Sequence, residues 1–106
     1  MANISQMLKG FLEGCILEIV NKKETYGYEI CETLVSYGFS NINEGSVYPL
    51  LIRLEKKGLI YFMTKESRFG PMRKYYHLTE DGSIFLCEFV ATWKLFRETI
   101  DKILEG

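Results

Sequence analysis

The chain is poor in the side chains from which most metal and catalytic sites are built. Among its 106 residues there is one histidine, His77, and the cysteines Cys15, Cys31 and Cys87 form no CxxC pair. A lone histidine and scattered cysteines cannot complete a zinc site, so we predict neither a metal nor a cofactor. Unpaired cysteines favour reduced thiols in a core, which is typical of cytoplasmic proteins.

Motifs for nucleotide binding and nucleophilic catalysis are also absent. The sequence contains neither GxxxxGK[ST] nor GxGxxG, so it offers no phosphate cradle. His77 stands alone beside Tyr75 and Tyr76, which favours a structural or phosphate-adjacent role over catalysis. The acidic pair Glu80-Asp81 follows Thr79, where carboxylates complement the start of a helix. We therefore expect that the protein is not an enzyme.

Long apolar runs are missing as well. No stretch approaches the roughly 18 apolar residues that a membrane-crossing helix needs. The N-terminal apolar residues are spaced rather than continuous, unlike those of a signal peptide. No repeat or Pro/Ser-rich linker interrupts a length that suits one domain. We expect a cytoplasmic protein without a membrane partner.

Positive charge, by contrast, is concentrated in one part of the chain. Between positions 46 and 77 there are seven basic residues and two acidic ones, whereas residues 1–45 and 78–106 each carry a net charge of −3. The total of −1 therefore hides a strongly basic segment. Such segregation is typical of a surface that binds nucleic-acid phosphates, although a solvated face is the alternative.

Apolar residues three and four positions apart predict helices in the first half of the chain. One helix covers about residues 4–20. A second is capped by Thr25 and stops at Gly38, and a third is capped by Asn43 and stops at Gly58. The second helix should turn Tyr28, Cys31, Leu34 and Val35 inward. The third should turn Val47, Leu50, Leu51 and Leu54 inward.

Two strands, about residues 59–65 and 73–78, should follow the third helix around a loop at 67–72 that contains Gly70-Pro71. A helix followed by a basic hairpin is the arrangement of a winged helix. The expected fold is therefore mostly α with a small β-hairpin (α+β), a winged helix-turn-helix.

The last helix should begin at Thr79 and run to about Leu104. Its large apolar residues alternate four and three apart, as in a coiled-coil seam; they are Leu86, Phe89, Trp93, Phe96, Ile100 and Ile103. At 1.5 Å per residue the helix is on the order of 35 Å long, so it should extend beyond the rest of a domain this small. We therefore expect a DNA-binding domain at 1–78, a dimerisation helix at 79–106, and a homodimer.

Trp93 admits two interpretations. It either packs in the seam between two subunits, or it forms an aromatic wall of a cavity for a small aromatic ligand at the dimer centre. The two interpretations are compatible, because a loosely packed seam is a cavity. Further candidate lining residues are Leu8, Phe11, Ile16, Phe89 and Phe96.

Four segments carry a resemblance to a known family: LKGFLEGCIL at 8–17, YGYEI at 26–30, GSVYPLLIRLEKKGLI at 45–60 and GPMRKYYHLTEDG at 70–82. Together they resemble the PadR-type transcriptional regulators. The single short terminal helix with a central tryptophan is similar to the small, multidrug-sensing LmrR-like branch.

The resemblance implies a winged helix-turn-helix, a homodimer, and a repressor of nearby genes that a small molecule releases. The third helix would enter the major groove of a pseudo-palindromic operator, and the wing would follow the backbone. The DNA-binding candidates are Ser46, Tyr48, Pro49, Arg53, Lys56, Arg68, Arg73 and Lys74. Ile52 departs from the family, which often has a basic residue there. A winged-helix module that binds proteins rather than DNA remains the alternative.

Overall fold

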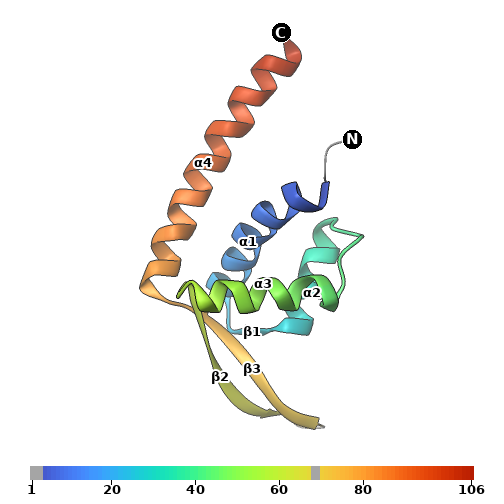
Figure 1. Ribbon diagram of the computed structural model, residues 1–106, viewed down its shortest axis with the longest axis vertical. Helices are drawn as coiled ribbons and strands as arrows, with labels where there is room; N and C mark the ends of the chain where they lie inside the picture. The colour runs from blue at the N-terminus through green and yellow to red at the C-terminus, as the bar shows by residue number, and fades with distance from the viewer. Residues whose placement is uncertain (1–3, 68–69) are drawn as a thin grey trace.

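The computed structural model describes residues 4–67 and 70–106, and of residues 4–8 it describes the backbone alone. The elements in chain order are α1 (Ile4–Lys22), β1 (Thr25–Tyr26), α2 (Gly27–Tyr37), α3 (Glu44–Lys56), β2 (Ile60–Ser67), β3 (Gly70–Leu78) and α4 (Glu80–Glu105). Figure 1 shows α1 to α3 gathered together, the β2–β3 hairpin projecting from one end, and α4 projecting from the other. The expected α+β winged-helix fold is confirmed.

The hydrophobic core lies between α1, α2 and α3 and extends to the base of the sheet. Ile16 and Leu17 of α1, Ile30 of α2 and Leu51 of α3 are completely buried. The predicted inward face of α3 is confirmed, because Val47, Leu50, Leu51 and Leu54 are all buried. This packing fixes the outward face of α3 relative to the rest of the domain.

The sheet has three antiparallel strands in the order β1-β3-β2. The hairpin is longer than predicted, because Gly70, Pro71 and Met72 belong to β3 rather than to a loop. Lys65 pairs with Arg73 and Phe62 pairs with Tyr76. The third strand, β1, was not expected; it pairs Thr25 with Tyr76 and Tyr26 with Tyr75, and so ties the hairpin to the start of α2.

The start of α2 differs from the prediction. Thr25 lies in β1 and its hydroxyl donates to the Glu29 carboxylate at 2.7 Å, while Tyr26 is the N-cap residue and its side chain makes no capping hydrogen bond to α2. Tyr28 and Val35 are exposed, and the buried face of α2 consists of Gly27, Ile30, Cys31 and Leu34. The prediction was therefore right for Cys31 and Leu34 and wrong for Tyr28 and Val35, because Gly27 and Ile30 complete the buried face instead.

The remaining helix ends follow the sequence signals. The Asn43 side chain accepts from the Ser46 N–H at 3.1 Å, and the Thr79 hydroxyl accepts from the Gly82 N–H at 2.9 Å. Gly38 and Gly58 adopt φ values of 125° and 75°, which other residues rarely adopt, and so end α2 and α3. The N-caps predicted from the sequence, Asn43 for α3 and Thr79 for α4, are thus confirmed.

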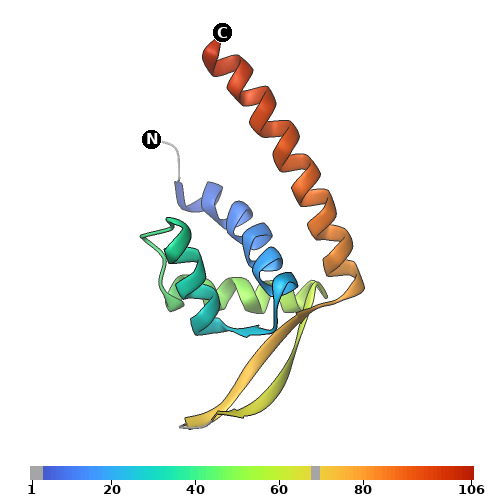
Figure 2. The same cartoon turned by 180° about the vertical axis from the view of Figure 1, so that it is seen from behind.

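The helix α4 contains 26 residues and leaves the body of the domain soon after it begins. Only Gly82 and Leu86 of α4 are buried. Figure 2 shows the C-terminal part of α4 extending well beyond the end of α1, which lies between α4 and α2. Among the described helices, none is long and apolar enough to cross a membrane.

Candidate nucleic-acid interface

The outward face of α3 carries the predicted recognition residues. The exposed residues of α3 are Glu44, Gly45, Ser46, Tyr48, Pro49, Ile52, Arg53 and Lys56, so the face carries one carboxylate beside its cations. The Ser46 hydroxyl also reaches the Asn43 side chain at 3.4 Å, so the cap holds it at the start of the helix. Because the opposite face is the core, this row of side chains is free to meet a partner.

The hairpin presents its basic residues on two faces. Arg73 and Lys74 are neighbours in β3, and successive side chains of a strand point to opposite sides. The Arg73 guanidinium lies 4.4 Å from the centre of the Tyr26 ring, and the Lys74 amine lies 4.4 Å from that of Phe62. These cation–π contacts hold both side chains against neighbouring aromatic rings. Because Arg73 and Lys74 point to opposite sides of β3, the hairpin carries a cation on each face.

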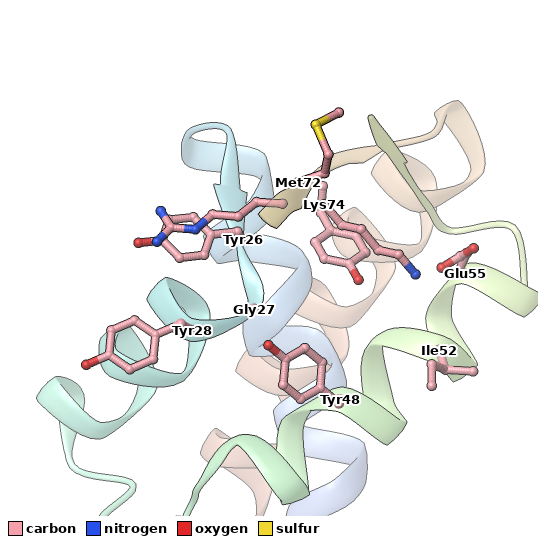
Figure 3. A pocket seen from close by; sticks show the side chains of 10 residues that line it. Tyr26, Gly27, Tyr28, Tyr48, Ile52, Glu55, Met72 and Lys74 are labelled. Atoms are coloured by element: carbon pink, nitrogen blue, oxygen red, sulfur yellow. The ribbon is translucent and has the colours of Figure 1, made fainter. Parts of the chain in front are cut away.

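A groove of about 420 Å³ separates α3 from the wing. Figure 3 shows Tyr26 and Tyr28 on one side, Tyr48 standing on α3, and the Lys74 amine pointing toward Glu55. Tyr48 packs closely on Gly27, where an added Cβ atom would lie 2.7 Å from the tyrosine ring. Sequence reasoning did not assign Tyr26 or Tyr28 to this surface, although both lie in the YGYEI segment.

Tyr76 forms the buried floor of this groove. Burial, together with the negative charge of Glu55, raises the pKa of the Tyr76 hydroxyl above its ordinary value. The phenol therefore stays protonated at neutral pH and adds no negative charge to the basic surface.

Acidic residues outside the basic segment neutralise part of it. Glu13 of α1 lies 3.4 Å from Arg53 Nε and 3.4 Å from Lys57 Nζ. Glu24 accepts a hydrogen bond from Lys65, and its other oxygen lies 3.1 Å from His77 Nε2. Within residues 4–67 and 70–106, Lys56, Arg73 and Lys74 form no ion pair. Arg68 lies outside the described residues.

The Glu24 cluster anchors the wing. The hydrogen bond from Lys65 is the main reason why the pKa of Glu24 lies below its ordinary value, and His77 adds to the effect. Glu24 therefore remains a carboxylate at neutral pH and ties the segment before β1 to both strands of the hairpin. His77 stacks on Tyr61 with ring centres 5.2 Å apart, which fits the structural one of the two predicted roles.

The predicted seam of α4 is largely uncovered. Trp93, Phe96, Ile100 and Ile103 are between 41% and 72% exposed. Phe89 is half-buried against Gly14, whereas Leu86 is buried in the chain's own core and leaves little surface for a partner. The face that remains is a continuous apolar strip along the projecting half of α4.

Phe11 and Trp93, two of the predicted ligand-binding residues, are brought together. Their rings meet edge to face with centres 5.5 Å apart, and both are partly exposed. Ile16 is completely buried in the core, so it cannot line an open cavity as expected. The Leu8 side chain lies outside what the structure describes.

The cysteines show one difference from the prediction of core thiols. Cys31 is buried and Cys15 is half-buried, but Cys87 is exposed on α4. Burial raises the pKa of the Cys15 and Cys31 thiols, so both stay protonated at neutral pH. The described part of the chain brings together no group of three side chains that could hold a metal ion.

The arrangement of an exposed helix, a cationic hairpin and a projecting apolar helix corresponds to a known family. Residues 16–88 match the transcriptional regulator PadR-like family. The chain belongs to this family. PadR-like proteins are transcription regulators that bind DNA, not enzymes, so the expectations of a DNA-binding regulator and of no enzyme activity are confirmed.

Solved structures and a related protein sequence agree with the PadR-like assignment. A PadR-like transcriptional regulator from Bacillus cereus is 48% identical, with a TM-score of 0.86 over 95% of this chain and 98% of that chain. A PadR-like transcription factor from Bacteroides fragilis is 42% identical, with a TM-score of 0.81 over 96% and 99%. A protein of uncharacterized function from Lysinibacillus sphaericus is 35% identical over 104 residues, covering 96% of this chain and 95% of that protein.

Proposed function

We propose that this PadR-like regulator is a homodimeric repressor that binds a pseudo-palindromic operator. In this proposal α3 enters the major groove, and Ser46, Tyr48, Pro49, Arg53 and Lys56 face the DNA. Arg73 and Lys74 of the wing meet backbone phosphates, together with Arg68. The observation that carries the proposal is that the outward face of α3 and the cations of β3, which form no ion pair within the described part of the chain, flank one groove.

Dimerisation through α4 would provide the symmetry that the operator requires. Two copies related by a two-fold axis place their recognition helices about 34 Å apart, which is one turn of DNA. Residues 79–106 then serve as the dimerisation segment of a unit whose residues 1–78 bind DNA. Repression follows if the bound dimer excludes RNA polymerase from a nearby promoter, in the cytoplasm of a prokaryotic cell.

Loss of the wing cations should weaken binding to every DNA sequence alike. Arg73→Ala and Lys74→Ala each remove one phosphate contact per subunit, so each should reduce the log–log salt slope of a dimer by about 2. Fluorescence anisotropy with specific and random duplexes at several salt concentrations measures this slope.

Lys102→Ala serves as the matched control for the wing variants. Lys102 lies in the last turn of α4, far along the helix from the hairpin, and its loss removes the same charge. An equal change of slope in Lys102→Ala and in the two wing variants would show that net charge, rather than contact by the wing, governs binding.

We further propose that Trp93 forms part of a site for small planar aromatic ligands between the two α4 helices. The half-exposed Trp93 ring, its edge-to-face contact with Phe11 and the exposed Phe96 beside it support this site. A bound ligand would act by favouring one spacing of the two α4 helices over another, and each helix carries one DNA-binding domain.

Trp93 should report such a ligand directly. It is the only tryptophan in the chain, so quenching by a planar dye such as Hoechst can be assigned to it. We expect Trp93→Ala to lose dye binding and to keep operator binding, whereas Tyr37→Ala, an exposed aromatic change on α2, should keep both. Unchanged Trp93 emission with micromolar dye, or a Trp93→Ala protein that no longer dimerises, would favour simple packing of the seam.

A further inference from the structure

Glu13 is a buried carboxylate that faces the recognition helix from α1. Its side chain is only 8% exposed. One oxygen lies 3.4 Å from Arg53 Nε, and the other accepts a hydrogen bond from Lys57 Nζ at 3.4 Å. A carboxylate removed from water needs such partners, so Glu13 holds both cations toward α1.

Contacts between α4 and the residues that flank Glu13 in α1 fix the position of this carboxylate. The neighbouring Gly14 lies against the Phe89 ring of α4, where an added Cβ atom would come within 2.2 Å. Phe11, two residues earlier, contacts Trp93 of α4. The same stretch of α1 therefore rests on α4 and reaches α3, so Glu13 cannot easily turn away from Arg53 and Lys57.

The two cations remain accessible to a partner. The Arg53 side chain is 58% exposed and that of Lys57 is 40% exposed. Arg53 meets Glu13 through Nε, so its terminal nitrogens keep donors for other acceptors. A DNA phosphate approaching this end of α3 meets two positive charges and one fixed negative charge.

We propose that Glu13 is a specificity-determining positioning residue of the DNA-binding surface. It orients Arg53 on α3 and cancels part of the charge of Arg53 and Lys57, which lowers the attraction of this surface for phosphates of any sequence. Non-specific binding depends almost entirely on phosphate contacts, whereas specific binding also needs oriented donors. Glu13 therefore widens the difference between operator and random DNA. This inference rests on the proposed mode of DNA binding.

The substitution Glu13→Gln tests the inference, because glutamine keeps the shape and removes the charge. We expect affinity for random DNA to rise several-fold and the log–log salt slope of a dimer to increase by about 2, as one more phosphate contact per subunit becomes effective. The ratio of operator to random affinity should fall by about 3- to 10-fold. Glu18→Gln, the same charge change on α1 at a residue whose side chain accepts a hydrogen bond from Asn21, should leave the ratio unchanged.

A second variant approaches the same question without altering Glu13. If Glu13 already neutralises Lys57, then Lys57→Gln should change the salt slope far less than Lys74→Ala does. In the double variant Glu13→Gln, Lys57→Gln, the gain in random-DNA affinity seen for Glu13→Gln should shrink. Circular dichroism establishes that each variant is folded before binding is measured.

The outcomes separate this inference from the proposed function. If the unaltered protein binds no DNA at low salt, the proposed function itself fails. If the unaltered protein binds DNA but Glu13→Gln leaves slope and ratio unchanged, or Lys57→Gln reduces the slope as much as Lys74→Ala, the role assigned to Glu13 is overturned.

Discussion

Replacing Ile100 with glutamate should convert the proposed dimer into a folded monomer and lower its affinity for an operator by about 100-fold or more. Ile100 is 51% exposed in the single chain, so it contributes little to the fold of that chain. In the proposed dimer it lies in the α4 seam, where a buried charge without a partner is costly. The loss of linkage between two half-sites removes an effective concentration worth about 10²- to 10⁴-fold in affinity.

Sedimentation and DNA titration measure the two parts of this prediction. The chain mass is 12.4 kDa, so the unaltered protein should sediment at about twice the mass of the Ile100→Glu variant. Lys94→Glu is the control, because it places the same glutamate side chain on α4 away from the seam. The Lys94→Glu protein should remain dimeric. An Ile100→Glu protein that still sediments as a dimer would show that the α4 seam does not hold the subunits together.

The Gly82→Ala substitution should have the largest effect on the stability of the chain itself. Gly82 is buried in the first turn of α4, and an added Cβ atom would lie 2.0 Å from the Leu59 carbonyl oxygen. That oxygen belongs to the backbone and already accepts from the Thr79 N–H at 3.1 Å, so it cannot easily move. We expect the free energy of unfolding to fall by about 1–3 kcal/mol or more.

Gly10→Ala is the matched control for the effect of an added methyl group. Gly10 lies in α1, and among the atoms that the structure describes a Cβ atom there would meet nothing within 4 Å. Alanine favours a helix interior over glycine by up to about 1 kcal/mol, so this variant should be slightly more stable than the unaltered chain. Urea denaturation compares the two variants, and equal changes in both would contradict the close contact between α4 and Leu59.

Elements whose signals are local could be predicted from the sequence. The periodicity of α1 and α3 and the caps Asn43 and Thr79 depend only on residues within a few positions. The strand β1 was missed, because Thr25 and Tyr26 form it only by pairing with Tyr76 and Tyr75, about 50 positions away. The hydroxyl of Thr25 resembled a helix cap but bonds to the Glu29 side chain instead.

In the candidate site, too, the features with local signals could be predicted and those that depend on distant contacts could not. The exposed residues of α3 and the cations of β3 follow from helix and strand periodicity, and the sequence places them correctly on the surface. The acidic partners were not visible in the sequence, since Glu13 and Lys57 are 44 positions apart and meet only when α1 packs on α3. Charge counted along the chain therefore overestimates the charge that is free to meet DNA.

The central claim is that two copies of the chain bind one operator through phosphates and the outward face of α3. The most direct test is sedimentation of a labelled duplex, taken from the DNA upstream of the protein's own gene, with the unaltered protein at 50 and 200 mM salt. We expect two chains per duplex and an affinity that falls by about 10³-fold or more between these salt concentrations. One chain per duplex, or an affinity that does not depend on salt, would contradict the proposal.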